Sequence, residues 1–304
     1  MAAAMLLLLL FFGVTTDRFL TLSNFQTISN QIPAAIIVAV GMTYILVVGG
    51  IDLSVGSGLA LCSAVFSVCL LRYDLPLPIS IIAAASTGFA IGLVNGAIIT
   101  RWSVPSFIVT LGMLEAARGL TFMVTDSQTQ YVGSKVDAIR DAEFAGFSLT
   151  FAFAIGIAIV GQLVLSHTAL GRQIVAVGYK EDVAYLSGIN PKRVKLIVFT
   201  LCGALVGIAS IIHTARMSAS DPNTGVGFEL EAIAAVVIGG TSLTGGRGSV
   251  LRSLFGVLVI AILGSGLAQA GAQEHTKRLI TGLVIVGAVI IDQYRRTQNP
   301  SGSR

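Results

Sequence analysis

Long apolar runs alternate with short polar connections along the whole chain. Eight runs, mostly near the ~20 residues that a helix needs to cross a bilayer, lie at 34–50, 55–71, 78–100, 104–124, 148–166, 194–215, 250–268 and 278–292. A shorter run occupies residues 2–14, and residues 229–240 form a half-length or tilted run. The pattern predicts an all-α polytopic membrane protein, one transmembrane domain over residues 1–304 with about ten transmembrane helices.

The longest polar connection, residues 167–195, is also patterned. Its basic side chains are Arg172, Lys180, Lys192, Arg193 and Lys195, and basic loops of this length stay in the cytoplasm. A short helix is expected from Glu181 to Leu186, with Gly178 and Gly188 supplying turns at its ends. Two interpretations are open: a shaped surface that contacts another protein, or a solvated connector.

Charge is distributed unequally between the two sides of a ten-span arrangement. With both termini inside, the cytoplasmic segments hold eleven Lys or Arg and four Asp or Glu, a net charge of +7. The outer segments, which include the polar loop 125–147, hold seven basic and ten acidic residues, a net charge of −3. The excess of Lys and Arg inside favours this orientation. The total charge of +4 therefore requires no nucleic-acid partner.

Composition agrees with a membrane protein and argues against metal or disulfide chemistry. Charged residues make up 11% of the chain and the mean hydropathy is +0.87, whereas soluble domains are about 25% charged. The three cysteines, Cys62, Cys69 and Cys202, lie inside predicted spans without metal-ligand spacing, and the three histidines are scattered. The first apolar run has no basic residues before it, so we interpret it as a span and not as a secretory signal.

Two glycine-rich segments of the chain are similar to each other. Residues 49–56 and 239–246 both read Gly-Gly-x-x-Leu-[Ser/Thr]-x-Gly, 190 residues apart, and each lies between two apolar runs. Transporters are often built from repeats with broken helices at corresponding positions, although a short match in a Gly-rich chain also arises by chance. Unwound backbone at membrane depth must be buried in protein or line water. The segments 49–57 and 239–248 are therefore either candidates for a pathway wall or tight cytoplasmic turns.

A few polar residues in apolar surroundings are the candidates for a translocation pathway. They are Asp52, Ser54, Asn95, Glu115, Arg118, Thr241 and Ser242. Asp52 either caps the helix that begins near Ser54 or binds a substrate or cation. Glu115 and Arg118 share a helix face at i, i+3, and pairing lowers the ~2.5–3.5 kcal/mol cost of a charge at the bilayer centre. Such a pair is either functional or a structural pair near the outer end of its span.

Signatures of catalysis are absent from the sequence. The segment from Gly240 to Arg247 comes nearest to a phosphate-binding loop, but it lacks the Lys-[Ser/Thr] that contacts the phosphates and the metal ion. The sequence contains neither a nucleophile elbow nor a His-Glu-x-x-His or paired-Cys motif. We therefore expect a transport component and not an enzyme.

Motifs along most of the chain resemble the permease subunits of ribose-type sugar ATP-binding-cassette importers. The early signature is matched by Gly41-Met42-Thr43 and by Gly49-Gly50-Ile51-Asp52-Leu53-Ser54-Val55-Gly56-Ser57, and Arg118-Gly119 matches the fifth span. The cytoplasmic loop is similar at Thr168, Gly171-Arg172, Ala176-Val177-Gly178 and Leu186-Ser187-Gly188-Ile189-Asn190. The eighth-span signature is similar from Gly227 to Leu243. The chain departs from the family at Glu115, where an apolar or small residue is expected, and in a shorter N-terminus.

The resemblance implies a bacterial inner-membrane importer for a simple sugar or related polyol. Its expected partners are a cytoplasmic ATPase that binds ATP and Mg²⁺, a periplasmic or lipid-anchored sugar-binding protein, and a second permease protomer, identical or different. No cofactor is expected in this chain. The resemblance places the ATPase on the loop, at Arg172, Gly178, Tyr179, Lys180, Glu181, Asp182, Ala184, Ser187, Gly188 and Asn190.

Two other functions are compatible with the sequence. One is an ion-coupled secondary transporter with Glu115 and Arg118 as the coupling pair, and the other is a nucleoside or amino-acid permease of the same superfamily. The loop 167–195 separates the first from an importer, because a carrier has no need of a helix that docks an ATPase.

Overall fold

Helices form almost all of the fold, as the apolar runs predict. The computed structural model describes residues 2–16, 19–144, 146–273, 275–277, 279–284 and 286–287. The helices are α1 (Ala2–Thr15), α2 (Leu22–Gln31), α3 (Pro33–Val47), α4 (Val55–Leu71), α5 (Leu77–Trp102), α6 (Ser106–Val124), η1 (Gly133–Val136), α7 (Asp137–Arg140), α8 (Leu149–His167), α9 (Ala169–Tyr179), α10 (Glu181–Leu186), α11 (Pro191–Met217), α12 (Phe228–Ile238) and α13 (Val250–Gln269). The all-α fold is thereby confirmed.

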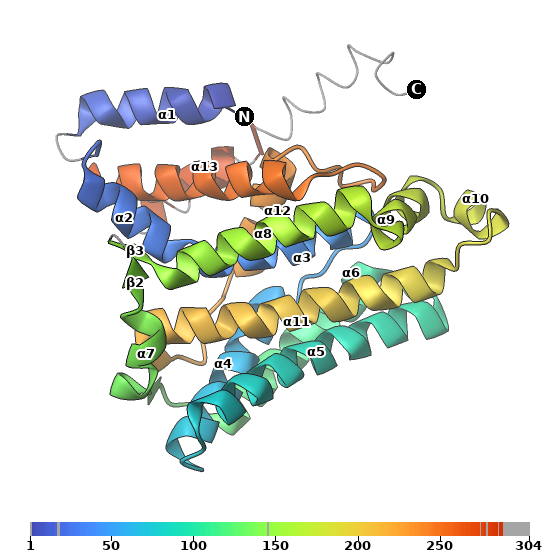
Figure 1. Cartoon of the computed structure of the whole chain (residues 1–304), viewed down its shortest axis with the longest axis horizontal. Coiled ribbons are helices and arrows are strands. Elements are labelled where there is room, and N and C mark those ends of the chain that lie inside the picture. The colour runs from blue at the N-terminus through green and yellow to red at the C-terminus, as the bar shows by residue number, and fades with distance from the viewer. Residues whose placement is uncertain are drawn as a thin grey trace.

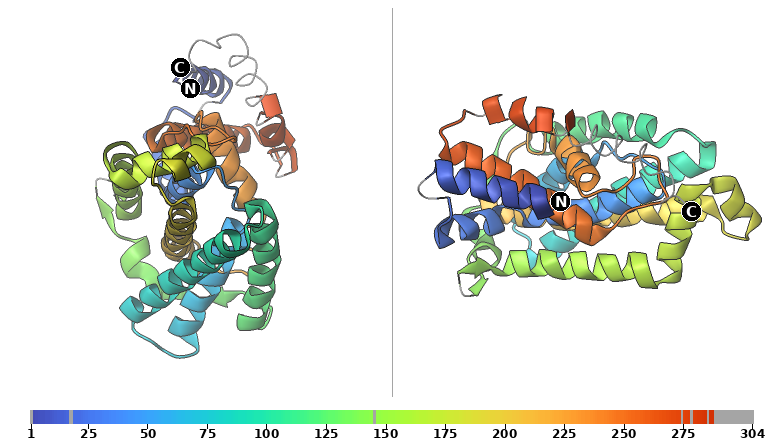
Figure 2. Two further views of the ribbon diagram at one scale, coloured as in Figure 1. Left: turned by 90° about the vertical axis from the view of Figure 1, so that its right-hand side faces the viewer. Right: turned by 90° about the horizontal axis from the view of Figure 1, so that it is seen from above.

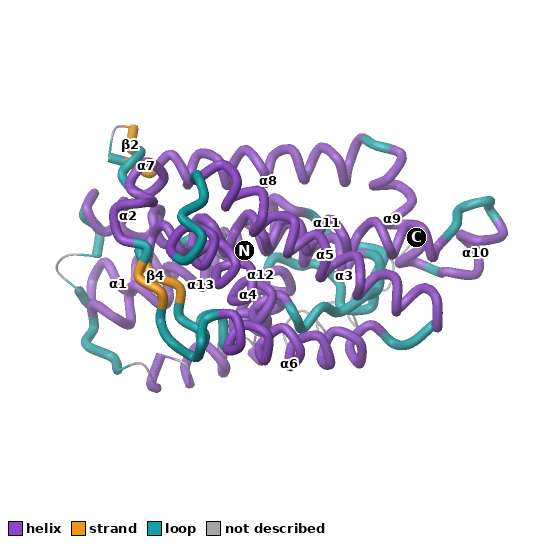
Figure 3. The backbone as a smooth tube through the Cα atoms, turned by 90° about the horizontal axis from the view of Figure 1, so that it is seen from below, coloured by secondary structure: helices purple, strands orange, loops and turns teal. Residues whose placement is uncertain are grey.

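Two short antiparallel ladders accompany the described helices. Strand β1 (Gln130–Tyr131) pairs with β4 (Ala219–Ser220), and β2 (Glu143–Phe144) pairs with β3 (Phe147–Ser148). Both lie at the same end of the molecule, together with α7, whereas α10 lies at the opposite end (Figures 1 and 3). These two ends are called the strand end and the α10 end. The predicted polar loops 125–147 and 167–195 therefore lie at opposite ends of the helical bundle.

Several of the described helices can cross a membrane by length and composition. Helices α5, α6, α8, α11 and α13 each qualify alone, and α2 with α3 forms a sixth candidate span that bends by 50°. Helix α4 and the part of α1 from Met5 are apolar but shorter. The predicted run 278–292 falls largely outside the described residues, although residues 279–284 and 286–287 are helical. The fold is polytopic, and the number of ten crossings stays a prediction.

Helix α11 lies between two groups of helices. Helices α3, α8, α12 and α13 lie on one side and α4, α5 and α6 on the other (Figures 1 and 2). Its contact with α5 is close because glycines alternate across it: Cβ atoms added at Gly88 and Gly203 would lie 2.3 Å and 2.2 Å from each other's carbonyl oxygens. A Cβ at Gly92 would lie 2.2 Å from the Phe199 carbonyl. Small residues at such spacings let helix backbones approach closely in a membrane.

Helix α2 is a correction to the sequence pattern, which predicted a polar connection before residue 34. The Thr21 hydroxyl accepts the Asn24 amide proton at the start of this helix (3.4 Å). Its Asn24 side chain is buried and donates to the Phe19 carbonyl (2.8 Å). Pro33, which has no N–H, begins a new helix in place of continuing α2. The predicted span 34–50 is therefore the second half of a bent span.

Ion pairs hold the connections at the strand end. Lys135 of η1 lies 2.5 Å from the Asp74 carboxylate, and its ammonium holds the pKa of that carboxyl below its ordinary value. The same ammonium donates to the Leu70 carbonyl at the end of α4. Arg140 of α7 contacts Asp141 in the same way and lowers the pKa of that carboxyl. Lys135 thus joins the predicted outer loop 125–147 to the end of α4.

Candidate functional site

Two interruptions of the helical structure coincide with the two glycine-rich segments. The first break, residues 48–54, separates α3 from α4, and the second break, residues 239–249, separates α12 from α13. Gly49 and Gly240 adopt positive φ angles of 83° and 89°. The backbone amides at the two helix ends donate hydrogen bonds to carbonyls of the preceding turn with the same spacing. Gly49 donates to Leu46 and Gly50 to Ile45, and likewise Gly240 donates to Val237 and Thr241 to Val236. Both helices therefore end in a Schellman motif.

The structural correspondence differs by one residue from the similarity in sequence. The repeated pattern aligns Gly49 with Gly239, an offset of 190 residues, whereas the helix-ending glycines are Gly49 and Gly240, an offset of 191. Gly239 remains in right-handed conformation at the C-cap of α12. The two breaks share the same backbone conformation, but the repeated sequence pattern aligns them with an error of one residue.

The backbone of the first break is held by hydroxyl groups from α6. Ser106 accepts the amide proton of Ile51 (2.9 Å), and Thr110 accepts that of Leu53 (3.1 Å). The Thr110 hydroxyl also lies 3.2 Å from the Ile51 carbonyl. Because an unpaired backbone group costs several kcal/mol in hydrocarbon, these two side chains make an unwound segment possible inside the bundle.

Asp52 turns the chain from the first break into α4. Its Oδ1 atom accepts both the amide proton (2.9 Å) and the hydroxyl proton (2.7 Å) of Ser54, the N-cap residue of α4. Asn95 of α5 donates its amide to the Ser54 hydroxyl (2.9 Å). Asp52 is 2% exposed and Asn95 is fully buried. The structure places these three predicted pathway residues together in a buried turn and not on an open surface.

The second break is held from other directions. Its Gly246 amide donates to the Val47 carbonyl at the end of α3 (2.8 Å). Gln162 of α8 accepts the Leu251 amide proton (3.2 Å) and the Ser249 hydroxyl proton (3.0 Å). Ser249 is the N-cap residue of α13.

Hydroxyl groups connect this break to α3 as well. The Thr43 hydroxyl contacts that of Ser253 (2.8 Å), which lies 3.4 Å from the Thr241 hydroxyl. The predicted pathway residues Thr241 and Ser242 are 1% and 2% exposed. They therefore belong to the buried support of the break.

The helices that flank the breaks begin halfway along the bundle. A Cβ added at Gly58, in the first turn of α4, would lie 3.5 Å from Val206, which is near the middle of α11. Gly225, in the loop that leads into α12, would bring a Cβ to 2.4 Å from the Gly56 carbonyl. Helix α4 runs from this point to the strand end and α12 runs to the α10 end (Figure 1). Two half-helices thus have their N-termini in contact inside the bundle.

Arg118 of α6 holds the loop before α12. Its guanidinium donates to the carbonyls of Pro222 (2.5 Å) and Thr224 (2.8 Å). The predicted ion pair with Glu115 is wrong: the two side chains form no salt bridge among the described residues, and Glu115 is exposed on the surface of α6. The guanidinium of Arg118 instead donates to the loop carbonyls, while the charge of Glu115 still acts on it.

Exposed apolar side chains follow in sequence the loop residues that Arg118 contacts. Val226 in the loop is 59% exposed and Leu230 of α12 is 61% exposed. The charges of Glu229 and Glu115 both act on Arg118. We call Glu115, Arg118, Val226, Glu229 and Leu230 the α6/α12 face. It combines charged and apolar groups at the depth where the half-helices begin.

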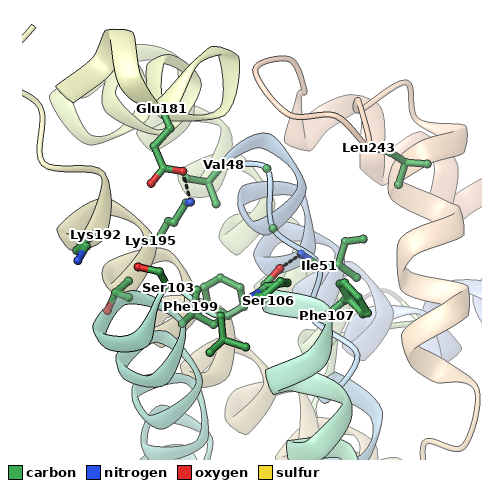
Figure 4. A pocket seen from close by; sticks show the side chains of 16 residues that line it. Val48, Ile51, Ser103, Ser106, Phe107, Glu181, Lys192, Lys195, Phe199 and Leu243 are labelled. Atoms are coloured by element: carbon green, nitrogen blue, oxygen red, sulfur yellow. Dashed lines mark hydrogen bonds and ion pairs between the residues drawn. The ribbon is translucent and has the colours of Figure 1, made fainter. Parts of the chain in front are cut away.

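A cleft of about 400 Å³ opens at the α10 end beside the first break (Figure 4). Residues 48–51 form one wall, the α5–α6 turn another, and the side chains of Lys192, Lys195 and Glu181 lie at its rim. Lys195 of α11 forms an ion pair with Glu181 of α10. Leu243 of the second break reaches the same cleft. Parts of both breaks and α10 therefore meet around one opening.

The loop 167–195 contains the predicted helix Glu181–Leu186 as α10. Gly188 has a φ of 82° and ends α10, as predicted. Asn190 accepts the Arg193 amide proton (3.1 Å) and Pro191 is the first residue of α11, which confirms the predicted start of that span. A correction concerns residues 169–179, which form the unpredicted helix α9, capped by Thr168.

Two residues of this loop have roles other than those predicted. Gly178 is helical within α9 and supplies no turn, which occurs instead at the extended residue Lys180. Ala184 is 3% exposed, so it packs inward and is not free for close approach by a partner. Exposed apolar side chains on and beside α10 are Tyr179, Val183, Tyr185 and Leu186.

The remaining predicted docking residues are spread over the loop. Arg172 and Ser187 are solvent-exposed, and Lys180, Glu181 and Asp182 lie on exposed positions at the start of α10. The described residues contain no group of three or more His, Cys, Asp or Glu side chains that could hold a metal ion.

Sequence reasoning missed the polar side chains that support the breaks. Ser106 and Thr110 are separated by four residues at the start of an apolar run, which places two hydroxyls on one helix face. That spacing was the available signal. Gln162, a lone amide within the run 148–166, was another. Neither pattern reveals its partner, because the partners are main-chain groups of distant segments.

Known proteins resemble this chain along almost its entire length. A family model described as "Branched-chain amino acid transport system / permease component" matches residues 24–289. The ribose import permease protein RbsC of Escherichia coli (strain K12) is 38% identical over 298 residues, 96% of this chain and 92% of that protein. The L-arabinose ABC transporter permease protein AraH of Azospirillum brasilense is 35% identical over 288 residues, 94% and 84% of the two chains. The fructose import permease protein FrcC of Rhizobium meliloti is 32% identical over 302 residues, 96% and 84%. No solved structure matches.

Proposed function

Because the chain belongs to the family of permease components of branched-chain amino acid transport systems, we propose that it is the membrane-spanning subunit of an ATP-driven sugar importer. The observation that carries this proposal is the 38% identity with a ribose import permease over 96% of the chain. Relatives with at least 32% identity are named for ribose, L-arabinose and fructose. The chain is a transport component and not an enzyme, and its substrate is a simple sugar or related polyol.

Such a permease works with an ATPase and with a binding protein that delivers the substrate. ATP and Mg²⁺ bind to the ATPase. We place the ATPase on α9 and α10, which lie at the end of the bundle opposite the strands (Figure 1). The exposed side chains Tyr179, Tyr185 and Leu186 supply apolar surface for this contact. A Leu186→Asp variant is expected to lose co-purification with the ATPase, and Leu186→Met serves as the matched control.

The orientation follows from charge. The α10 end carries the basic loop 167–195 and is placed in the cytoplasm, and the loop 125–147 then faces the periplasm. Both termini would be cytoplasmic, in the inner membrane of a bacterium. A thiol probe introduced at Ser187 should react only from the cytoplasm, and one at Ser134 only from outside. Gln298, a further labelling position, lies outside the described residues. Reaction of both probes from one side would contradict the arrangement.

A second permease protomer is proposed to cover the α6/α12 face. Charged groups at bilayer depth are costly when they face lipid, so Glu115 and Arg118 are expected to face a water-filled pathway between two protomers. Half-helices whose N-termini meet inside the bundle are typical of transporter substrate sites. The sugar would pass along this face, with Asp52, Ser54 and Asn95 holding the first break behind it.

The experiment is reconstitution of the permease with its ATPase and binding protein in liposomes. ATP-dependent uptake should be measured for labelled ribose, arabinose and fructose, and for leucine and a nucleoside, because the family description names amino acids. We expect uptake of a sugar that requires all three components. Uptake by this chain alone, driven by a Na⁺ or H⁺ gradient, would identify an ion-coupled carrier. Uptake of leucine or the nucleoside in place of sugars would identify the other superfamily function.

A further inference from the structure

Three segments far apart in sequence meet through their backbones at the α10 end. A Cβ added at Gly178 of α9 would lie 1.8 Å from the Val47 carbonyl oxygen and 2.6 Å from the Gly246 nitrogen. A Cβ at Gly245 would lie 2.6 Å from the Gly178 carbonyl and 3.1 Å from the Gly49 Cα. The Gly246 amide donates to the Val47 carbonyl (2.8 Å). We call Val47, Gly49, Gly178, Gly245 and Gly246 the glycine junction.

The contacts of the glycine junction are between main-chain atoms. Side chains can change rotamer to absorb a small displacement, whereas a contact between two backbones has no such freedom. Packed interiors have low compressibility and transmit strain. A shift of α9 must therefore displace the end of α3 and the second break together.

From the junction, two routes lead to the same point inside the bundle. Val47 and Gly49 continue through the first break into α4, and Gly245 and Gly246 belong to the second break, which follows α12. The other ends of these routes meet where Gly225 contacts Gly56. The glycine junction and the contact between the half-helices are therefore connected by two separate segments of the chain, which together form a closed ring.

The junction also lies next to α10, where the ATPase is proposed to bind. Gly178 precedes α10 by two residues, Tyr179 and Lys180, and α10 is fixed to α11 by the ion pair of Glu181 with Lys195. The α10 cleft is lined by Gly49, Gly50 and Leu243 from the breaks as well as by Glu181 (Figure 4). A displacement applied to α10 has a short path to the junction.

We propose that the glycine junction transmits movement of α10 to both half-helices, and that Gly178 is a positioning residue for coupling ATP hydrolysis to transport. This inference rests on the proposed importer function. It specifies that the junction stays in contact throughout the transport cycle, so that α9 and the two breaks move as a unit. A methyl group at position 178 would force α9 away from Val47 and break this unit.

The first test is the Gly178→Ala variant, with Gly156→Ala in α8 as the matched control because no atom lies within 4 Å of that Cβ. We expect Gly178→Ala to assemble with the ATPase and hydrolyse ATP, while sugar imported per ATP hydrolysed falls about tenfold, within the range of allosteric coupling energies. The control should keep the wild-type ratio. An unchanged ratio in an assembled Gly178→Ala complex would overturn the proposal.

A second test decides the question even where Gly178→Ala fails to fold. A Cβ at Gly246 would lie 3.2 Å from the Tyr179 Cβ, slightly closer than the range of about 3.5–4.5 Å in disulfides. The double variant Tyr179→Cys/Gly246→Cys should therefore form a disulfide both without nucleotide and in an ATP-trapped state. The readout is the yield of the disulfide in each state, with the single variants as controls; uptake is not used, because Tyr179 belongs to the surface proposed to contact the ATPase.

The outcomes separate this proposal from the proposed function. A disulfide that forms in only one of the two states would show that the junction separates, which overturns the proposal. If the wild-type complex imports no sugar at all, the proposed function fails. The cross-linking readout in the two nucleotide states still tests the junction in that case.

Discussion

The two breaks have the same beginning and different support. Each starts with a Schellman motif at a glycine of positive φ, Gly49 in the first and Gly240 in the second. The first break is then held by two hydroxyls of a neighbouring helix, Ser106 and Thr110 of α6. The second is held by the end of α3 and by Gln162 of α8. A local signal can thus end a helix, whereas the hydrogen bonds of the unwound backbone that follows depend on neighbouring helices.

The difference also divides the functional connections of the breaks. The first break depends on α6, which carries Arg118 and Glu115 of the α6/α12 face. The second depends on α3 and contacts α9, which precedes the docking helix. Substitutions in the two supports should therefore lower the stability by separate, additive amounts, which can be measured by thermal unfolding of the purified protein in nanodiscs.

The largest effect is expected at Gly239, where the sequence echo and the structure disagree. A Cβ at this position would lie 2.5 Å from the Arg252 carbonyl of α13, so Gly239→Ala should destabilise by about 3 kcal/mol through overpacking. If Gly239→Ala had the same melting temperature as Gly240→Ala, the alignment of Gly49 with Gly239 in the sequence repeat would be favoured instead.

A smaller loss is expected when the first break loses its support. Thr110→Val leaves the part-buried amide of Leu53 without its acceptor, which costs about 1–3 kcal/mol. Thr121→Val is the control on the same helix, because the buried Thr121 hydroxyl donates only to the Ala117 carbonyl of its own helix. Equal losses in the two variants would show that the contact between α6 and the break contributes nothing.

The corresponding change at the second break is Gln162→Leu. It removes the side chain that accepts the Leu251 amide proton at the start of α13, and the loss of such a hydrogen bond costs about 1 kcal/mol. Combined with Thr110→Val, its effect should be additive, because the two supports share no partner. Strong non-additivity in the double variant would mean that the breaks are not supported independently.

Effects equal to each other are expected at the shared glycines. No atom lies within 4 Å of a Cβ added at Gly49 or at Gly240, so substitution by Ala costs only the left-handed conformation, about 1–2 kcal/mol. Gly49→Ala and Gly240→Ala should therefore lower stability by the same amount. A clear difference between them would mean that the two helix ends are not equivalent.

The elements predicted correctly from sequence are those determined by local signals. Helix α10, the turn at Gly188 and the start of α11 at Asn190 and Pro191 each depend on residues within one turn. Asp52 was assigned a capping role as one alternative, and its contact with Ser54 is also local. Helix α9 does not follow from the sequence, because the polar composition of residues 167–195 predicts a loop.

The errors concern residues whose neighbours are distant in sequence. Gly178 was assigned a turn because glycine permits one, yet its small size serves a contact with Val47, 131 positions earlier. Ala184 was assigned to a partner and is buried instead. Arg118 was paired with Glu115 by helical spacing, whereas its partners are Pro222 and Thr224. Spacing along one helix cannot reveal a loop that folds back against it.

The central claim is that the half-helix α12 borders a water-filled pathway, and thiol accessibility tests it most directly. Leu230 of α12 and Ile159 of α8 are both apolar and exposed, at 61% and 49%. In the assembled complex, Leu230→Cys should react with a charged, membrane-impermeant thiol reagent and be protected by the transported sugar, while Ile159→Cys, facing lipid, should not react. If the thiol at position 230 were as unreactive as the one at position 159 in every nucleotide state, the pathway would not lie along α12.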